Sequence, residues 1–263
     1  MTRTRWLAVG AGAAALGALA SGAAAANGAT KIAASLDTAQ EVPTPSGVSA
    51  RAGGTFTGTI SEGRRPRLTW RLSYRGLSGP AVQAHVHLGR PGVAGPVAVT
   101  LCGPCGTRTR GSAPISAAVR RALLNGTAYV NVHTASNGSG EIRGQVGLVV
   151  RARLTVGQEV PRPSGARGAN GAFTGRLVGS RISWTLRYRG LTGQAVQAHI
   201  HLGRRGVAGP VAVTLCGPCR SGRRGVETLT ARQLRALRSG RTYVNVHTAR
   251  NGAGEIRGQV RVG

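Results

Sequence analysis

Residues 128–146 read AYVNVHTASNGSGEIRGQV, and nearly the same letters return as TYVNVHTARNGAGEIRGQV at residues 242–260. In each copy, apolar and polar residues alternate on both sides of a short Asn- and Gly-containing run, a pattern typical of a β-hairpin. If residues 134–140 form the connection, His133 lies opposite Glu141. One polar face of the hairpin then carries Tyr129, Asn131, His133, Glu141, Arg143 and Gln145.

The hairpin belongs to a unit that occurs twice. Eight landmark residues recur 114 positions later: Trp70, His85, His87, Cys102, Cys105, Tyr129, His133 and Glu141 have the copies Trp184, His199, His201, Cys216, Cys219, Tyr243, His247 and Glu255. Each unit is long enough to bury a core of its own. We therefore predict one domain at residues 27–147 and a second at 148–263. Because the join has no Pro- or Ser-rich spacer, the domains are expected to sit close together.

The rest of each unit is also mostly β in pattern. In residues 81–88 one face carries Val82, Ala84, Val86 and Leu88, and the other carries Gln83, His85 and His87. One short helix precedes the Tyr-Val-Asn-Val-His strand in each unit, and the second helix begins after Thr230 and ends at Gly240. The expected fold is all-β, with two tandem antiparallel sandwich or barrel domains.

The N-terminal segment has the pattern of a secretory signal peptide. Arg3 and Arg5 precede an apolar run, and Ala24 to Ala26 fit an A-x-A cleavage site. Residues 1–26 are therefore interpreted as a signal peptide, with an uncleaved membrane anchor as the alternative. No later apolar run reaches transmembrane length, so we expect a secreted or cell-surface protein with no transmembrane segment in the mature chain.

The four cysteines form two Cys-Gly-Pro-Cys motifs. In an exported protein such pairs favour disulfides over zinc, and we expect Cys102 to pair with Cys105 and Cys216 with Cys219. Pairing between the repeats is the alternative. A thioredoxin-type redox motif would stand at the start of a helix, whereas the residues after Cys105 are typical of a loop.

The net charge of +28 arises from 35 Lys and Arg residues against 7 Asp and Glu residues. Export and an aromatic content of 3% argue against nucleic acid, because base stacking needs aromatic side chains. An anionic cell-wall polymer or polysaccharide fits the charge better, and an extracellular protein is a further candidate partner. The alternative is that the charge only keeps an exported protein soluble.

Several motifs, in order and in both units, resemble the CHRD domain, which is named after chordin. They are QEVP, GL(S/T)G, AH(V/I)HLG with AGPV, YVNVHT and GEIRGQV. The resemblance implies an extracellular β-rich module. In animals chordin binds bone-morphogenetic growth factors, but the composition of this chain looks bacterial, so that partner is not carried over. Ala94 and Ala208 stand where the family often has Asn, and Asn137-Gly138 replaces a commoner Asn-Pro; both changes fall in turns.

All six histidines are landmark residues: His85, His87, His133, His199, His201 and His247. Two histidines separated by one residue on a strand share a face. If the strand that ends at His133 is a neighbour, three imidazoles converge and leave an open coordination position. Glu141 and Glu255 are candidates to orient a metal-binding imidazole by accepting a hydrogen bond from its other ring nitrogen. Arg143 could attract an anion, or it could form a cross-strand pair with Glu141.

Three imidazoles suit copper or zinc. The His-x-His pair with a distant third His also resembles the copper half of the Cu/Zn superoxide dismutases, although there is no bridging fourth His and no zinc loop. Two readings without metal remain open, a hydrogen-bonded cluster that fixes strand packing and a pH-sensitive surface. Ser-His-Asp catalysis has little support, because Asp37 is the only Asp and has no copy in the second unit.

These observations predict an exported tandem binding or surface-associated module, with one possible transition-metal site per domain. The enzyme alternative is a copper-dependent oxidoreductase of superoxide-dismutase type. No residue of the chain is assigned a catalytic role.

Overall fold

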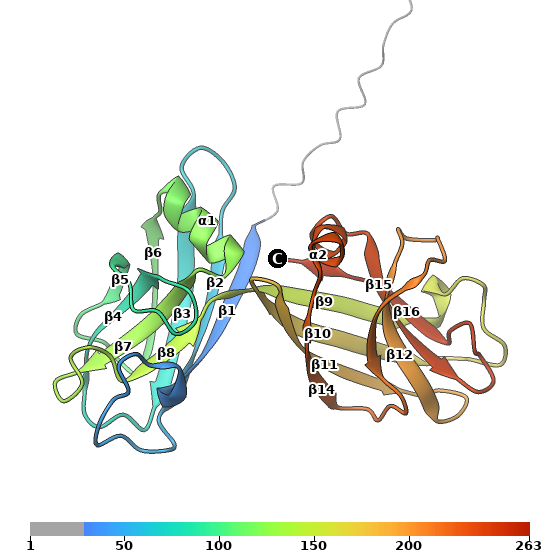
Figure 1. Ribbon diagram of the computed structural model, residues 1–263, viewed down its shortest axis with the longest axis horizontal. Coiled ribbons are helices and arrows are strands. Elements are labelled where there is room, and N and C mark those ends of the chain that lie inside the picture. The colour runs from blue at the N-terminus through green and yellow to red at the C-terminus, as the bar shows by residue number, and fades with distance from the viewer. Residues whose placement is uncertain (1–28) are drawn as a thin grey trace, which may run out of the picture.

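Each repeat folds into a curled antiparallel sheet, as Figure 1 shows for the computed structural model, which describes residues 29–263. The predicted signal peptide, residues 1–26, lies outside the described residues. The strands of the first domain are β1 (Thr30–Asp37), β2 (Gly53–Ile60), β3 (Arg67–Arg75), β4 (Ala81–Leu88), β5 (Val97–Cys102), β6 (Arg108–Pro114), β7 (Ala128–Thr134) and β8 (Ile142–Gln145). Their pairing gives the order β5-β4-β7-β8-β1-β2-β3-β6.

The second domain repeats this arrangement. Its strands are β9 (Gly147–Thr155), β10 (Asn170–Val178), β11 (Arg181–Arg189), β12 (Ala195–Leu202), β13 (Val211–Cys216), β14 (Arg223–Thr228), β15 (Thr242–Thr248), β16 (Ile256–Gln259) and β17 (Arg261–Val262). Short 3-10 turns, η1 (Thr38–Gln40) and η2 (Val156–Gln158), follow β1 and β9. The predicted tandem all-β architecture is confirmed.

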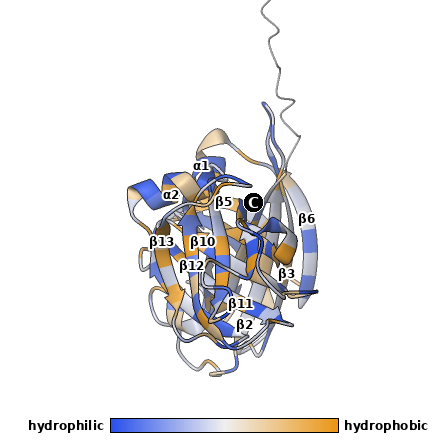
Figure 2. Ribbon diagram, turned by 90° about the vertical axis from the view of Figure 1, so that its right-hand side faces the viewer, coloured by the Kyte–Doolittle hydropathy of each residue, from blue (hydrophilic) through white to orange (hydrophobic). Residues whose placement is uncertain are grey.

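Apolar residues at alternate strand positions build the core of each domain. In the first domain, Phe56, Leu68 and Trp70 come from β2 and β3, and Val86 and Val130 come from β4 and β7. All five are at most 5% exposed. Burying a side chain of this kind stabilises a fold by roughly 1.5–3 kcal/mol. The alternation of hydrophobic and hydrophilic residues is visible along the strands in Figure 2.

The two predicted helices, α1 (Ala117–Asn125) and α2 (Ala231–Arg238), are confirmed, and so is the Thr230 cap at the start of α2. The Ser116 hydroxyl accepts a hydrogen bond from the Val119 amide, and Gly126 ends α1 with a φ of 71°. Thr230 and Gln233 form a capping box at the start of α2. Each cap satisfies amide groups that the first helical turn leaves free. No helix within residues 29–263 is long and apolar enough to cross a membrane.

The hairpin register is also confirmed, because β7 pairs with β8 through Asn131 opposite Arg143 and Tyr129 opposite Gln145. The polar face of the hairpin is buried, as is every residue of β7. One detail of β4 differs from the expected alternation. An irregularity between Ala81 and Gln83 turns Val82 outward, where it is 42% exposed.

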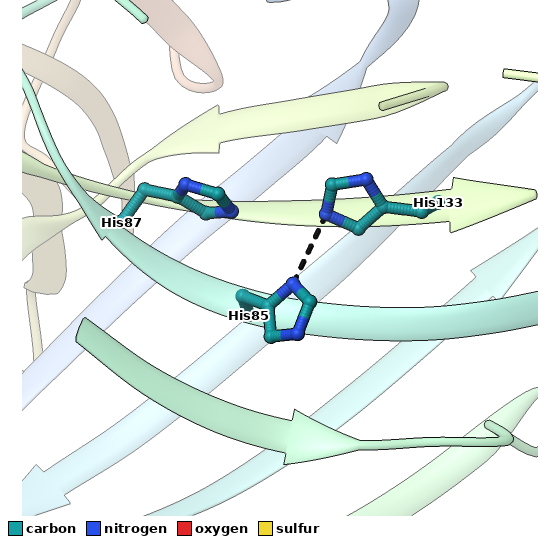
Figure 3. Close-up of side chains that lie close together, drawn as sticks. All are labelled: His85, His87 and His133. Carbon is teal, nitrogen blue, oxygen red and sulfur yellow. Dashed lines mark hydrogen bonds between the residues drawn. The ribbon is translucent and has the colours of Figure 1, made fainter. Parts of the chain in front are cut away.

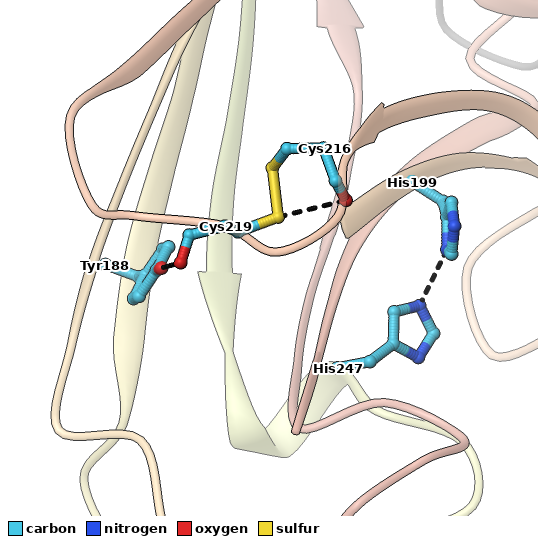
Figure 4. Close-up of a disulfide and its surroundings, with 5 residues drawn as sticks. All are labelled: Tyr188, His199, Cys216, Cys219 and His247. Atoms are coloured by element: carbon cyan, nitrogen blue, oxygen red, sulfur yellow. Dashed lines mark hydrogen bonds between the residues drawn. A yellow bond between two sulfur atoms is a disulfide. The ribbon is translucent and has the colours of Figure 1, made fainter. Parts of the chain in front are cut away.

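Both cysteine pairs form disulfides within their own motif, Cys102 with Cys105 and Cys216 with Cys219. Each bridge closes a turn at the end of a strand, and no helix follows it, so the setting of a thioredoxin-type motif is absent at residues 102–108 and 216–223. The Tyr188 hydroxyl donates to the Cys219 carbonyl at 2.9 Å, as Figure 4 shows. The disulfide thereby ties β13 to β11.

Strand β9 belongs to both domains. Its first residues, Gly147 and Leu148, pair with β1 of the first domain. From Leu148 to Thr155 it pairs with β10 of the second. Arg238 of α2 adds a contact across the junction, because its guanidinium donates to the Asn125 side chain and the Leu124 carbonyl at 3.2 Å each. The domains are joined without a linker.

Candidate metal centre

Three histidines of each domain converge at one place on the sheet. His85 and His87 lie on β4, and His133 lies on its antiparallel neighbour β7. The pairing sets Gln83 opposite His133, so His85 and His133 are diagonal neighbours on one face. One ring nitrogen of each histidine lies within 4.8 Å of the other two. Figure 3 shows the three rings gathered at one place. The second domain brings His199, His201 and His247 together in the same way.

The ring separations are nearly identical in the two copies. In the first domain the ring centroids of His85 and His133 are 5.1 Å apart, and that of His87 lies 5.6 Å and 5.8 Å from them. The three equivalent separations in the second domain are 5.0, 5.5 and 5.7 Å. Both repeats therefore preserve the cluster's geometry as well as its residue types.

Backbone carbonyls orient two of the three imidazoles. His87 Nδ1 lies 2.9 Å from the Gly95 carbonyl oxygen, and His133 Nδ1 lies 3.0 Å from that of Gly138. Because a carbonyl oxygen only accepts hydrogen bonds, both Nδ1 atoms carry the proton. Each Nε2 is then left with its lone pair. His201 and His247 have the same partners in the second domain, the carbonyls of Gly209 and Gly252.

The third imidazole is oriented differently. His85 Nδ1 faces His133 Nε2 at 3.2 Å, the hydrogen bond drawn in Figure 3. One proton lies between these two nitrogens when no ion is bound. If that proton leaves, three lone pairs can coordinate an ion: one on Nδ1 of His85, and one on Nε2 of each of His87 and His133. No other His, Cys, Asp or Glu within residues 29–263 joins either group, so further coordination positions are left for water or another small ligand.

Burial keeps the imidazoles neutral. It lowers the pKa of His85 to about 4, and the nearby His133 and His87 add to the effect. Burial lowers the pKa of His199 to about 4 in the same way. Neutral imidazole is the form that binds metal, so the donors are available at neutral pH. Each of the six histidines retains 7% or 8% exposure, which leaves the cluster in contact with solvent at its edge.

Acidification from pH 6.5 towards 4 is expected to destabilise the metal-free protein through these histidines. In this range the unfolded chain binds protons at His85 and His199 that the folded chain does not, so the free energy of unfolding falls as the pH falls. Burial raises the pKa of Glu159 to about 7, which acts in the opposite direction. Thermal unfolding of wild type and of His85→Asn/His199→Asn in chelator isolates the histidines, because the variant should show the weaker dependence. Equal dependence in both proteins would contradict the prediction.

A tyrosine and an arginine secure the loop that supplies the Gly95 carbonyl. The Tyr129 ring stacks on His87 at 4.9 Å between centroids, and its hydroxyl accepts a hydrogen bond from the Gly95 amide at 3.0 Å. The Arg143 guanidinium lies 3.4 Å above the Tyr129 ring and donates to the carbonyls of Arg90 and Val93. Arg143 is thus engaged in holding the loop, and it makes no pair with Glu141.

Sequence reasoning did not identify the role of this loop, although Gly95 carries a signal. A Cβ atom there would collide with the Leu88 carbonyl oxygen, so only glycine lets the loop lie this close to β4. The close approach is what brings the Gly95 carbonyl within reach of His87. Tyr129 was placed correctly on the histidine face, but its contact with the loop depends on the folded path of residues 89–96.

Glu141 contacts none of the histidines through a hydrogen bond. Its carboxylate accepts from the Ser78 amide at 2.6 Å, the Ser78 hydroxyl at 2.5 Å, the Thr134 hydroxyl at 2.7 Å and the Asn137 amide at 3.3 Å. Glu255 is held in the same way by Thr192, Thr248 and Asn251. The carbonyls of Gly95 and Gly138 therefore take the orienting role that was expected of Glu141 and its copy Glu255.

Comparison with known proteins agrees with this duplicated architecture. A family model described as the CHRD domain matches residues 32–146 and again residues 150–260. A search of curated proteins gives no match. The two matched segments together cover most of the chain. The protein therefore belongs to the CHRD domain family and carries two tandem copies of the domain.

Proposed function

We propose that the protein is an exported binding module and that each domain holds one copper or zinc ion through three histidines. One observation supports this proposal most directly. His87 Nε2 is a buried ring nitrogen that has no hydrogen-bond partner among the described residues, and the same holds for His201 Nε2 in the second domain. An unpaired buried acceptor costs free energy, and an ion at the centre of the cluster would remove that cost. Imidazole donors alone suit copper and zinc better than magnesium or calcium.

Export is supported by the sequence of residues 1–26 and by the two disulfides, which persist in oxidising compartments. CHRD domains are typically extracellular modules. In this setting the ion would be taken from outside the cytoplasm, and the buried histidines would hold it between the loop at residues 89–96 and the turn at residues 135–140.

Metal loading of the purified full chain tests the proposal. After incubation with excess copper(II) or zinc(II) and removal of unbound ions, elemental analysis should give about two ions per chain, in line with one three-histidine site per domain. Bound copper should also show nitrogen couplings in its electron paramagnetic resonance spectrum. Recovery of fewer than about 0.2 ions per chain with both metals would overturn the proposal.

A copper-dependent oxidoreductase of superoxide-dismutase type is the second candidate. It is supported by the three-ligand set, because an incomplete coordination sphere leaves room for a substrate. At such a site copper would supply one-electron chemistry, and the histidines would hold it and limit access to it. Superoxide consumption by the copper-loaded chain, compared with the zinc-loaded chain, separates the two. If the chain binds copper but does not consume superoxide, only the binding function remains.

A further inference from the structure

The acidic residues of the chain are mostly hidden from solvent. Of the seven, Glu41, Glu141, Glu159 and Glu255 are at most 5% exposed. Within residues 29–263, the one ion pair joins Glu62 to Arg120. Four of the seven carboxyl groups therefore lie inside, and few negative charges remain at the surface to offset the exposed arginines.

Arginine and hydroxyl side chains share the outer face of β1, β2, β3 and β6. One row across these strands runs from Thr57 to Arg71 to Arg110, and the next from Thr55 to Ser73 to Arg108. The hydroxyls of Thr55 and Ser73 lie 2.9 Å apart. Along a row the groups are about 5 Å apart, and along a strand about 7 Å. A hollow of about 510 Å³ lies over this face, and its lining includes Lys31, Arg71 and Arg110.

The second domain presents the equivalent face. Arg151, Thr174, Thr185 and Arg224 form one row across β9, β10, β11 and β14. A hollow of about 690 Å³ joins the two faces, because Thr55 and Thr57 line it from one domain and Thr174, Thr185 and Arg224 from the other. In Figure 1 the two sheets lie on either side of the junction. No acidic residue lines either hollow.

The side chains of Arg71, Arg110, Arg151 and Arg224 are exposed and have no hydrogen bond or ion pair within the described chain. They contribute nothing evident to folding, and they crowd positive charge together. Such a cluster is stabilised when an anionic ligand covers it. A planar guanidinium pairs with a carboxylate through two parallel hydrogen bonds, which makes arginine well suited to a ligand that carries carboxylates.

We propose that the paired outer faces bind an acidic polysaccharide, a polymer that carries both carboxylate and hydroxyl groups. The carboxylates would pair with the arginines, and the sugar hydroxyls would exchange hydrogen bonds with the Thr and Ser side chains between them. A hydroxyl both donates and accepts, so a ligand with hydroxyl groups uses this face more fully than one with phosphates alone. The linings of the two hollows include only three aromatic residues, Phe56, Trp70 and Trp184, and all three are buried, so no exposed ring is available there to stack on a nucleobase.

Binding of the full chain to polygalacturonate tests the proposal. The test variant carries Arg71→Ser, Arg110→Ser, Arg151→Ser and Arg224→Ser. The matched control carries Arg64→Ser, Arg65→Ser, Arg121→Ser and Arg232→Ser, which removes the same charge from exposed positions outside both faces. We expect at least about a tenfold loss of affinity in the test variant and less than about a threefold loss in the control, with a shallower salt dependence in the test variant.

Equal losses in the two variants would overturn the proposal, because they would mean that net charge alone attracts the polymer. Inorganic polyphosphate and duplex DNA serve as competing ligands at the same salt concentration. If either binds as tightly as polygalacturonate, the face does not select a polymer with hydroxyl groups. A fourfold Arg→Lys variant at the test positions retains charge and should recover only part of the affinity, and circular dichroism confirms that each variant is folded.

Discussion

His87→Ala is expected to abolish metal binding in the first domain and to leave one ion per chain, held by the second domain. His87 contributes the Nε2 atom that has no other partner, so its loss leaves two donors. Changes to residues that only support a ligand weaken metal affinity by about 10-fold to 100-fold, and loss of the ligand itself should cost at least as much. Elemental analysis after loading should therefore fall from two ions to one.

Two further variants make the result specific. His201→Ala should produce the same stoichiometry from the other domain, and the combined variant should bind no ion. Tyr129→Phe is the matched control, because it removes the hydroxyl that accepts from the Gly95 amide but retains the ring that stacks on His87. Two ions per chain in His87→Ala, or only one ion per chain in Tyr129→Phe, would contradict the assignment of these ligands.

Glu141→Gln should lower the free energy of unfolding of the first domain by about 3 kcal/mol, within the range for lost hydrogen bonds to a buried charge. Burial alone would raise the pKa of Glu141, but hydrogen bonds from Ser78, Thr134 and Asn137 lower it below its ordinary value. The carboxylate is therefore ionised and accepts only. An amide group in its place would turn a donor towards these donors, and chemical denaturation measures the resulting loss.

Glu62→Gln is the control for this experiment. Glu62 is exposed and pairs with Arg120 at the surface, so its replacement should change stability by less than about 1 kcal/mol. The hydrogen bonds from Ser78, Thr134 and Asn137 to Glu141 form a buried cluster, the Glu141 cluster. Through Asn137 this cluster holds the turn whose Gly138 carbonyl orients His133. Metal affinity in the first domain should therefore fall with stability. A Glu141→Gln protein as stable as Glu62→Gln would show that the cluster is dispensable.

Much of the fold could be predicted because it depends on local pattern. The alternation in residues 128–146 indicates both strands and their register, and Thr230 marks the start of the second helix. The convergence of the histidines required one further assumption, that the strand containing His133 lies beside the one containing His85. The duplicated sequence supported that assumption, because each unit contains three histidines and no more, and they stand at equivalent positions in the two units.

What could not be predicted depends on loops that fold over the sheet. Alternation identifies two faces of a strand but does not say which face solvent reaches, so it did not reveal that the polar layer around Asn131 is buried. Glu141 was a reasonable candidate to orient His133 because it is its cross-strand neighbour. Its side chain instead reaches Ser78, a residue 63 positions away in sequence that only the folded chain brings near.

The strand shared by the two domains makes their stabilities interdependent. Backbone groups of β9 complete the first sheet at Gly147 and Leu148 and begin the second from Leu148 onward. Unfolding of either domain would remove hydrogen-bond partners from the edge of the other. A ligand that binds only the folded form of one domain therefore lowers the population of the unfolded form of both. Occupancy of one histidine cluster thus contributes to the integrity of its neighbour without any contact between the two clusters.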